Sequence, residues 1–187
     1  MAHPFTKEDH RKILVIGTGV GLDAIALAKL TGAKVTATDI SKQALVVAQL
    51  NAKIHEMENK VKYIQSDLLD SVTTQFDLII FNAPRAVTHE IFKEAGVPNE
   101  KALKAIETLQ DSPNYLFDMH GTLFKKLMKD LPEHTTKDGK LLIMTDEHIG
   151  VHVPSNYGIK PLSDPLRWDI DNSDDHNFRI FEIDPNQ

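Results

Sequence analysis

The sequence of 187 residues contains no cysteine. Disulfide bonds and thiolate metal sites are therefore excluded, and a reducing cytoplasm is the simplest compartment for such a chain. No apolar stretch approaches the ~20 residues that a membrane-spanning helix needs. The N-terminal segment, MAHPFTKEDHRK, is too polar for a signal peptide. We therefore expect a cytoplasmic protein with no membrane segment.

An excess of basic charge is also missing. The net charge is −6, and residues 161–187 alone hold seven acidic residues against two basic ones. This balance argues against a broad basic surface for nucleic acid, although it leaves a local site open. No internal repeat or low-complexity linker divides the chain. Its length fits one domain, which can bury roughly 70% of its unfolded surface, so we expect residues 1–187 to form a single domain.

The sequence does contain short apolar runs that alternate with helical patterns. Four strands are predicted in the first half of the chain, over Lys12–Ile16, Ala33–Asp39, Val61–Gln65 and Phe76–Asn82. A helix is predicted over Asp23–Leu30, and Ser41 can cap a second helix with an apolar stripe of Ala44, Leu45, Ala48 and Ala52. Strands that alternate with helices predict an α/β fold, a parallel sheet with helices on both faces.

The second half of the chain is less regular. Residues 83–139 hold two helical patterns, around Ala102–Leu109 and Leu123–Leu131, and Pro132 is expected to stop the second helix. Residues 137–139 then predict a turn before a fifth strand over Lys140–Thr145. Two extended runs, residues 166–170 and 178–183, predict a C-terminal antiparallel hairpin in which Trp168 packs.

Three glycines at alternate positions, Gly17, Gly19 and Gly21, follow the first strand. Glycine is needed where φ is positive or where a Cβ would block a ligand, and a loop at a helix N-terminus can point free amides at that ligand. The dinucleotide fingerprint G-x-G-x-x-G is broken, because Leu22 follows the third glycine. Asp39 ends the second strand, where its carboxylate can accept both hydroxyl protons of a ribose. The alternative is a tight strand–helix turn beside a solvated aspartate.

Polar groups also follow the third and fourth strands. Asp67 can accept a hydrogen bond from an adenine amino group, or it is a helix N-cap or a surface acid. In FNAPR, Asn82 and Ala83 offer a side-chain and a backbone carbonyl side by side, and Pro84 fixes the direction of the chain. Two such acceptors can hold an NH2 group, and the alternative is a simple strand-end turn. Because ligands of parallel sheets bind at the carboxyl ends of strands, we expect these groups to share one crevice.

Several motifs together resemble the class I S-adenosylmethionine-dependent methyltransferases. IGTGVG, ATDIS, ALVVAQLNAK, QSDLLD and FDLIIFNAPR occur in the family's order over about residues 12–85, and KDGKLLIMT extends the match to about residue 145. The chain is most similar to the group whose fourth strand ends in N-P-P-Y, which includes release-factor glutamine methyltransferases and amino methyltransferases of DNA and RNA bases. FNAPRAVT is most similar to the glutamine-modifying enzymes.

This resemblance implies a fold, a cofactor and an activity. The fold would be a Rossmann-like, doubly wound, mostly parallel seven-stranded sheet with the C-terminal antiparallel hairpin. The cofactor would be S-adenosyl-L-methionine, with no metal. The activity would be methyl transfer to an NH2 nitrogen of a protein or nucleic-acid acceptor, with protein glutamine slightly preferred over a nucleobase.

The resemblance also implies roles for single residues. The methionine end of the cofactor would be lined by Gly17, Thr18, Gly19 and Gly21. Asp39 would hold the ribose with Ile40 against the adenine, and Asp67 and Leu68 would flank the adenine edge. Asn82, also a cofactor contact, would hold the target NH2 together with the carbonyl of Ala83. Pro84 and Arg85 would complete the catalytic motif, and Arg85 can stack through its guanidinium or pair with an anion.

Three departures from the family pattern keep other functions open. Val15 stands where an acid is usual, Ala83 replaces proline, and Arg85 replaces an aromatic residue. A binding module that does not transfer methyl groups is therefore one alternative, and a nicotinamide-dependent oxidoreductase is another. Glutamine enzymes of this group often carry an N-terminal recognition domain, which the 11 residues before the first strand do not provide. We expect acceptor recognition to come from residues 83–139, the acidic tail or a partner protein.

One histidine pair has the spacing of metal ligands on a helix. His148 and His152 lie four residues apart, but Gly150 lies between them and no third ligand is evident. Loop or surface histidines are the better interpretation, so no metal site is expected.

Overall fold

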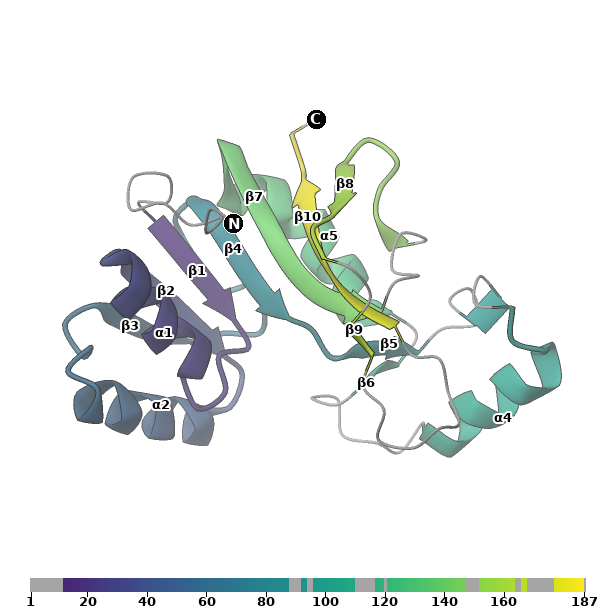
Figure 1. Ribbon diagram of the computed structural model, residues 1–187, viewed down its shortest axis with the longest axis horizontal. Helices are drawn as coiled ribbons and strands as arrows, with labels where there is room; N and C mark the ends of the chain where they lie inside the picture. Colours follow the sequence, from purple (N-terminus) through teal and green to yellow (C-terminus); the bar gives the residue numbers. More distant parts are fainter. Residues whose placement is uncertain are drawn as a thin grey trace. The chain divides into compact units, whose positions relative to one another are not determined.

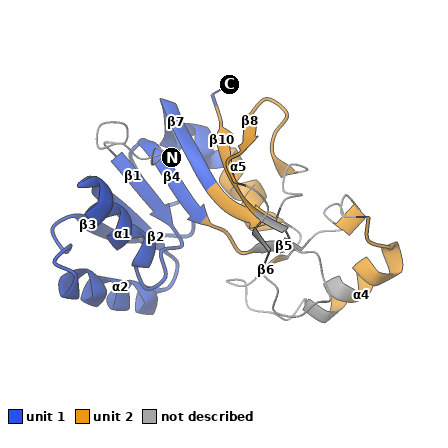
Figure 2. Ribbon diagram, in the orientation of Figure 1, with its two compact units in different colours: residues 1–81, 130–142, 186 blue, residues 82–129, 143–185, 187 orange. Residues whose placement is uncertain are grey.

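The computed structural model describes residues 12–87, 92–93, 96–109, 117–119, 121–146, 152–163, 166–167 and 177–186. The chain divides into two compact units (Figure 2). The first comprises residues 1–81, 130–142 and 186, and the second comprises residues 82–129, 143–185 and 187. Two elements, α5 (Thr122–His134) and β7 (Thr135–Asp146), run from one unit into the other.

Parallel strands form the sheet of the first unit (Figure 1). They are β1 (Lys12–Ile16), β2 (Lys34–Asp39), β3 (Val61–Gln65) and β4 (Phe76–Asn82). β1 pairs with both β2 and β4, and β2 also pairs with β3. The register places Ile16 opposite Thr38 and Phe81, so the strands bring their carboxyl ends to the same edge of the sheet. The four strands predicted from the sequence are confirmed to within one residue.

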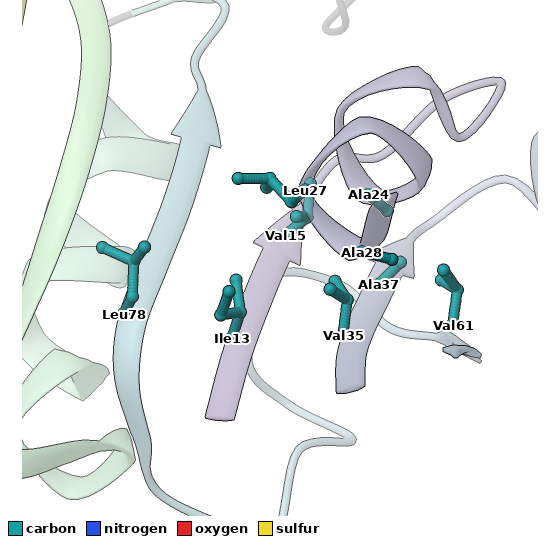
Figure 3. Close-up of a cluster of buried hydrophobic side chains, with 9 residues drawn as sticks. All are labelled: Ile13, Val15, Ala24, Leu27, Ala28, Val35, Ala37, Val61 and Leu78. Carbon is teal, nitrogen blue, oxygen red and sulfur yellow. The ribbon is translucent and has the colours of Figure 1, made fainter. Parts of the chain in front are cut away.

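The core of this unit follows from the apolar alternation of the strands. Helix α1 (Leu22–Thr31) packs on the sheet through small residues, so the two approach closely. Figure 3 shows the buried cluster, which consists of Ile13, Val15, Ala24, Leu27, Ala28, Val35, Ala37, Val61 and Leu78. Burial of such side chains is worth about 1.5–3 kcal/mol for each large aliphatic residue.

Helix α2 (Lys42–Ile54) begins at the predicted cap. Ser41 has an extended backbone, and its Oγ accepts a hydrogen bond from the Ala44 amide at 3.2 Å. The side chains that α2 buries are Leu45, Ala48 and Ala52, as the apolar stripe predicted.

Strand β7 corrects the turn that was predicted at residues 137–139. The strand begins at Thr135 and runs without interruption to Asp146. Gly139 is explained by close packing, because an added Cβ would lie 2.6 Å from the carbonyl oxygen of Phe76. The pattern K-D-G is typical of turns, but here the glycine serves a close backbone approach inside a strand.

The tail of the chain supplies antiparallel strands. β10 (Asn177–Asp184) pairs with β8 (Gly158–Pro161) and with β9 (Leu166–Arg167). The β9–β10 pairing confirms the predicted hairpin in part, whereas β8 was not predicted, because GIKP is short and largely exposed. Trp168 lies outside the described residues.

The strands of the larger sheet follow the order β3-β2-β1-β4-β7-β10-β8, with β9 beside β10. Seven strands make the continuous path; parallel pairs form the first unit, and antiparallel pairs form the C-terminal end. The predicted fold class, a mostly parallel seven-stranded α/β sheet with antiparallel C-terminal strands, is confirmed. Within the described ranges, no helix is both long and apolar enough to cross a membrane.

The segment between β4 and β7 contains both predicted helices and two short strands that were not predicted. The helices are α4 (Asn99–Leu109) and α5, and the strands β5 (Arg85–Val87) and β6 (Phe117–Met119) pair in parallel. Three-residue strands leave too short a pattern to recognise in the sequence.

Pro132 does not stop α5, contrary to the prediction. The helix continues two residues further, to His134. Proline has no amide hydrogen, so the carbonyl of Met128, four residues earlier, loses its helical donor. The hydroxyl of Tyr157 donates to that carbonyl at 2.7 Å, which supplies the missing hydrogen bond.

Candidate functional site

The glycine loop has the backbone conformation that the sequence predicted. Gly17, Gly19 and Gly21 all have positive φ, at 63°, 53° and 87°. Residues other than glycine rarely adopt a positive φ, because their Cβ then approaches the following carbonyl oxygen. The loop also lies at the carboxyl edge of the first unit's sheet, directly after β1.

Three amides of this loop are not open donors, which corrects one expectation. Thr18 donates to the carbonyl of Thr38 at 2.9 Å, and Gly21 donates to the carbonyl of Thr18 at 2.9 Å. The amide of Gly19 donates to Oδ2 of Asp39 at 2.8 Å. Three of the loop's donors are therefore used within the protein, so the loop is not arranged like a phosphate cradle of free amides.

Asp39 is the group that fixes the loop to the end of β2. Its second oxygen, Oδ1, accepts a hydrogen bond from the amide of Ser41 at 2.9 Å. A carboxylate offers about four lone-pair positions, so each oxygen retains capacity for one more donor. The carboxylate is only partly buried. Two further donors, such as a pair of ligand hydroxyls, can therefore be accepted by this carboxylate.

Gly21 and Gly19 differ in what surrounds them. A Cβ at Gly21 would lie 2.9 Å from the Cβ of Ala48 and 3.1 Å from the hydroxyl of Tyr63, so this glycine lets the loop pack against α2 and β3. A Cβ at Gly19 would meet no atom of the described residues within 4 Å, its two chain neighbours aside. The open space beside the loop is therefore at Gly19, on the same residue whose amide orients Asp39.

Two side chains that support the loop were missed by the sequence reasoning. Asn51 of α2 donates from Nδ2 to the carbonyl of Val20 at 2.9 Å. Tyr63 lies under Gly21, and burial raises the pKa of its phenol above the usual value, so it is neutral at pH 7. Neither contact could be predicted, because an asparagine within a helix and a tyrosine within a strand occur commonly without contacting a loop.

Thr18 has a hydroxyl without a partner. Its Oγ1 is buried and makes no hydrogen bond to any part of the chain that the structure describes. A buried hydroxyl that lacks a partner costs about 1–3 kcal/mol. Its position in the glycine loop makes it a candidate for contact with a ligand.

The residues after β2 and β3 occupy the same edge of the sheet. Asp39 lies opposite Gln65, and the side chain of Gln65 donates to the carbonyl of Ile40 at 3.1 Å. Ile40 is 67% exposed, so its side chain is accessible to a ring that packs on this edge. Asp67 is also exposed.

Leu68, which was expected to flank the adenine, is more buried than a side chain that lines an open site. It is only 7% exposed, and it has a positive φ of 51°. A leucine in this region is strained by about 1–3 kcal/mol, and such strain gathers at functional sites.

The NAPR motif starts at the end of β4. Asn82 is exposed, and the amide of Ala83 donates to the carbonyl of Met144 at 3.2 Å. Pro84 is partly buried, and β5 begins directly after it with Arg85 opposite Phe117. The side chain of Arg85 lies outside what the structure describes. Asn82–Arg85 belong to the second unit, whereas the glycine loop, Asp39 and Asp67 belong to the first.

No cluster of three or more histidine, aspartate or glutamate side chains suited to a metal ion occurs among the described residues. His148 of the predicted pair lies outside them. His152 is described, and its ring lies 6.4 Å from that of Phe124.

A family model described as "Methyltransferase small domain" matches residues 1–109, more than half of the chain. The chain belongs to the methyltransferase small domain family. The match begins in the first unit and extends into the second, so it includes both the glycine loop and the NAPR motif.

Named relatives of this chain agree with the family. It is 33% identical over 138 residues to a release factor glutamine methyltransferase of Lactococcus lactis, over 73% of this chain and 48% of that protein. It is 30% identical to a Methanocaldococcus jannaschii protein provisionally named protein N5-glutamine methyltransferase MJ0928, over 82% of this chain and 70% of that protein. The chain therefore spans about half the length of the Lactococcus relative.

Solved structures show the same fold. The 16S rRNA N2 G1207 methyltransferase of Thermus thermophilus matches 93% of this chain and 37% of its own, with a TM-score of 0.62 at 13% identity. At that identity the likeness concerns the fold alone.

Proposed function

We propose that this domain transfers a methyl group from S-adenosyl-L-methionine to an NH2 nitrogen, and that the acceptor is a protein glutamine. The observation that carries the proposal is the hydrogen bond from Gly19 to Asp39. It orients a carboxylate beside a loop position, Gly19, at which no other described residue fills the space of a Cβ. Membership of the methyltransferase family makes the adenosyl donor the ligand that such a site would hold.

The side chains and backbone of the first unit are chemically suited to hold this donor. When bound, S-adenosylmethionine supplies a methyl group already activated on a sulfonium. Asp39 would accept hydrogen bonds from the ribose, Ile40 would cover the adenine, and Asp67 with Leu68 would flank it. Gly17, Thr18 and Gly19 would line the methionine end, and Gly21 would hold the loop against α2.

The acceptor side of the proposal rests on NAPR. Asn82 Oδ1 and the carbonyl of Ala83 would accept the two hydrogens of an NH2 group, and Pro84 would fix their direction. These hydrogen bonds would strengthen in the transition state, because the attacking nitrogen loses electron density. Correct orientation of the reactants can lower the activation barrier by a further ~7–11 kcal/mol. Arg85 would contact the acceptor through its guanidinium.

Protein glutamine is favoured over a nucleobase by two observations. Two relatives at 30% identity or more are named for glutamine methylation. The net charge of −6 gives no general attraction for polynucleotides. Recognition of the acceptor through a partner protein, and a cytoplasmic location, belong to the same proposal.

We also propose that residues 1–187 work as one methyltransferase domain. The family match runs from the first unit into the second, and α5 and β7 are shared by both. The nicotinamide alternative loses support, because the chain belongs to a methyltransferase family and its loop lacks the dinucleotide spacing.

Calorimetry with S-adenosylhomocysteine and with NAD tests the donor site. The wild-type chain should bind the adenosyl compound at least tenfold more tightly than NAD. Asp39→Ala should weaken binding at least tenfold, because it removes charge-assisted hydrogen bonds worth about 1.5–3 kcal/mol. Glu58→Gln, a change at an exposed acid beyond α2, is the matched control and should leave binding unchanged.

Labelled methyl transfer tests the acceptor. Wild type should label glutamine in a protein extract and not RNA or DNA, and Asn82→Ala should abolish transfer while donor binding falls less than in Asp39→Ala. Label in nucleic acid alone would overturn the choice of acceptor. Binding without any transfer would favour the non-catalytic module.

A further inference from the structure

Two side-chain amides of the first unit hold backbone carbonyls in the two loops that flank the proposed donor site. Asn51 of α2 donates from Nδ2 to the carbonyl of Val20 at 2.9 Å. Gln65, at the end of β3, donates from Nε2 to the carbonyl of Ile40 at 3.1 Å. Both bonds reach a backbone atom, so an effect of either amide on donor binding would act through the backbone of a loop.

The bond from Asn51 completes the support of one peptide plane. The peptide that joins Val20 to Gly21 has its N–H on Gly21, which donates to the carbonyl of Thr18 at 2.9 Å. Its carbonyl, on Val20, accepts the bond from Asn51, so both polar groups of this planar unit are held. The side chain of Val20 is 54% exposed and gives the loop little packing. The orientation of the peptide therefore depends on its hydrogen bonds.

Glycine makes this peptide easy to rotate. Gly21 has a φ of 87°, and a glycine also reaches negative φ without a steric penalty. Rotation of the plane would break the bond from Gly21 to Thr18 that closes the turn. Gly19 lies inside that turn, so the rotation would also disturb the open space beside it. The bond from Asn51 opposes the rotation and thereby preserves the space proposed for the methionine end of the donor.

The loop after β2 is held in the same way. The peptide that joins Ile40 to Ser41 donates its N–H, on Ser41, to Oδ1 of Asp39 at 2.9 Å. Its carbonyl, on Ile40, accepts the bond from Gln65. Gln65 lies opposite Asp39 in the register of β2 and β3, so its side chain starts from a fixed place beside the loop. The bond from Gln65 therefore fixes the segment that carries the proposed ribose and adenine contacts.

We propose that Asn51 and Gln65 are positioning residues for S-adenosyl-L-methionine and that they act on opposite ends of it. Asn51 holds the turn at the methionine end, and Gln65 holds the segment at the adenosine end. These roles rest on the proposed donor site, and they extend it to two side chains that act through backbone atoms. The net contribution of one hydrogen bond corresponds to roughly a three- to tenfold change in affinity.

Calorimetry with S-adenosylhomocysteine and with adenosine separates the two ends, because adenosine lacks the amino-acid portion. Asn51→Leu and Gln65→Met remove the donating group, keep nearly the same size and add no charge. Asn51→Leu should weaken binding of S-adenosylhomocysteine about three- to tenfold and leave adenosine within about twofold of wild type. Gln65→Met should weaken both ligands about three- to tenfold, because both carry the ribose and the adenine.

Gln49→Met is the matched control, because Gln49 is an exposed amide on α2, and it should leave both affinities unchanged. Circular dichroism should show all three variants folded at the temperature of the assay, since Gln49 and Gln65 are exposed and Asn51 is only partly buried. The ratio of the two affinities does not depend on the folded fraction. A merely structural role for Asn51 would therefore lower both affinities equally.

The outcomes separate these roles from the donor site itself. If wild type binds S-adenosylhomocysteine, three results would overturn the roles and leave the donor site standing. They are equal losses of both ligands in Asn51→Leu, unchanged affinities in either variant, and a loss in Gln65→Met that unfolded protein accounts for. A wild type that binds neither ligand would overturn the donor site, and both positioning roles with it.

Discussion

At the scale of the residue, Gly19 and Gly21 of the loop need glycine for different reasons. Gly21→Ala should lower the free energy of unfolding by about 2–5 kcal/mol, because positive φ and close contact with Ala48 both oppose a Cβ. Gly19→Ala should cost about 1–2 kcal/mol, because only the backbone opposes it. Chemical denaturation of the two variants measures this difference.

Gly19→Ala should affect donor binding more than it affects folding. Its Cβ would enter the space proposed for the donor, so the free energy of binding S-adenosylhomocysteine should fall by more than the free energy of unfolding does. An affinity equal to wild type would show that the open space at Gly19 is not part of the donor site.

Thr18 offers a second test at this scale. Thr18→Val keeps the shape of the side chain and removes a buried hydroxyl that has no partner among the described residues. The free energy of unfolding should therefore stay the same or rise by about 1 kcal/mol. If the hydroxyl serves the donor, calorimetry should show affinity lowered about three- to tenfold. A loss of stability instead would mean that the hydroxyl has a structural partner.

At the scale of the element, the end of α5 depends on a hydrogen bond from outside the helix. Tyr157→Phe should cost about 1 kcal/mol of unfolding free energy, because the carbonyl of Met128 loses its donor. In a Pro132→Ala background the cost should be smaller, because an alanine amide can make the helical bond. A double-mutant cycle measures this coupling, and additive effects would contradict the explanation.

The elements that were predicted well and badly differ in their physical basis. β1 and β4 were predicted closely because their apolar runs are buried and bounded by glycine or polar residues, whereas β2 and β3 were predicted from their β-branched and aromatic residues. The turn before β7 and the stop at Pro132 were wrong because tertiary contacts override local preference there. The space at Gly139 is set by Phe76, and the missing donor at Pro132 is replaced by Tyr157.

The candidate site shows the same division. The positive φ of Gly17 and Gly19 and the place of Asp39 at the end of β2 could be predicted, because glycine spacing and a strand end are visible in the sequence. The hydrogen bond that joins Gly19 to Asp39 could not, since both ends were assigned to the ligand instead. Asn51 was missed because its partner, the carbonyl of Val20, is a backbone atom that no sequence pattern names.

At the scale of the whole molecule, the shared elements determine how the chain unfolds. α5 and β7 each contribute residues to both compact units, so neither unit can unfold while the other keeps these elements whole. We therefore expect one cooperative transition, with a calorimetric enthalpy equal to the van't Hoff enthalpy. S-adenosylhomocysteine should raise the melting temperature of that single transition, because a ligand that binds only the folded chain stabilises all that unfolds with its site. Two transitions, of which only one responds to the ligand, would show two independent domains and would contradict the proposal of a single methyltransferase domain.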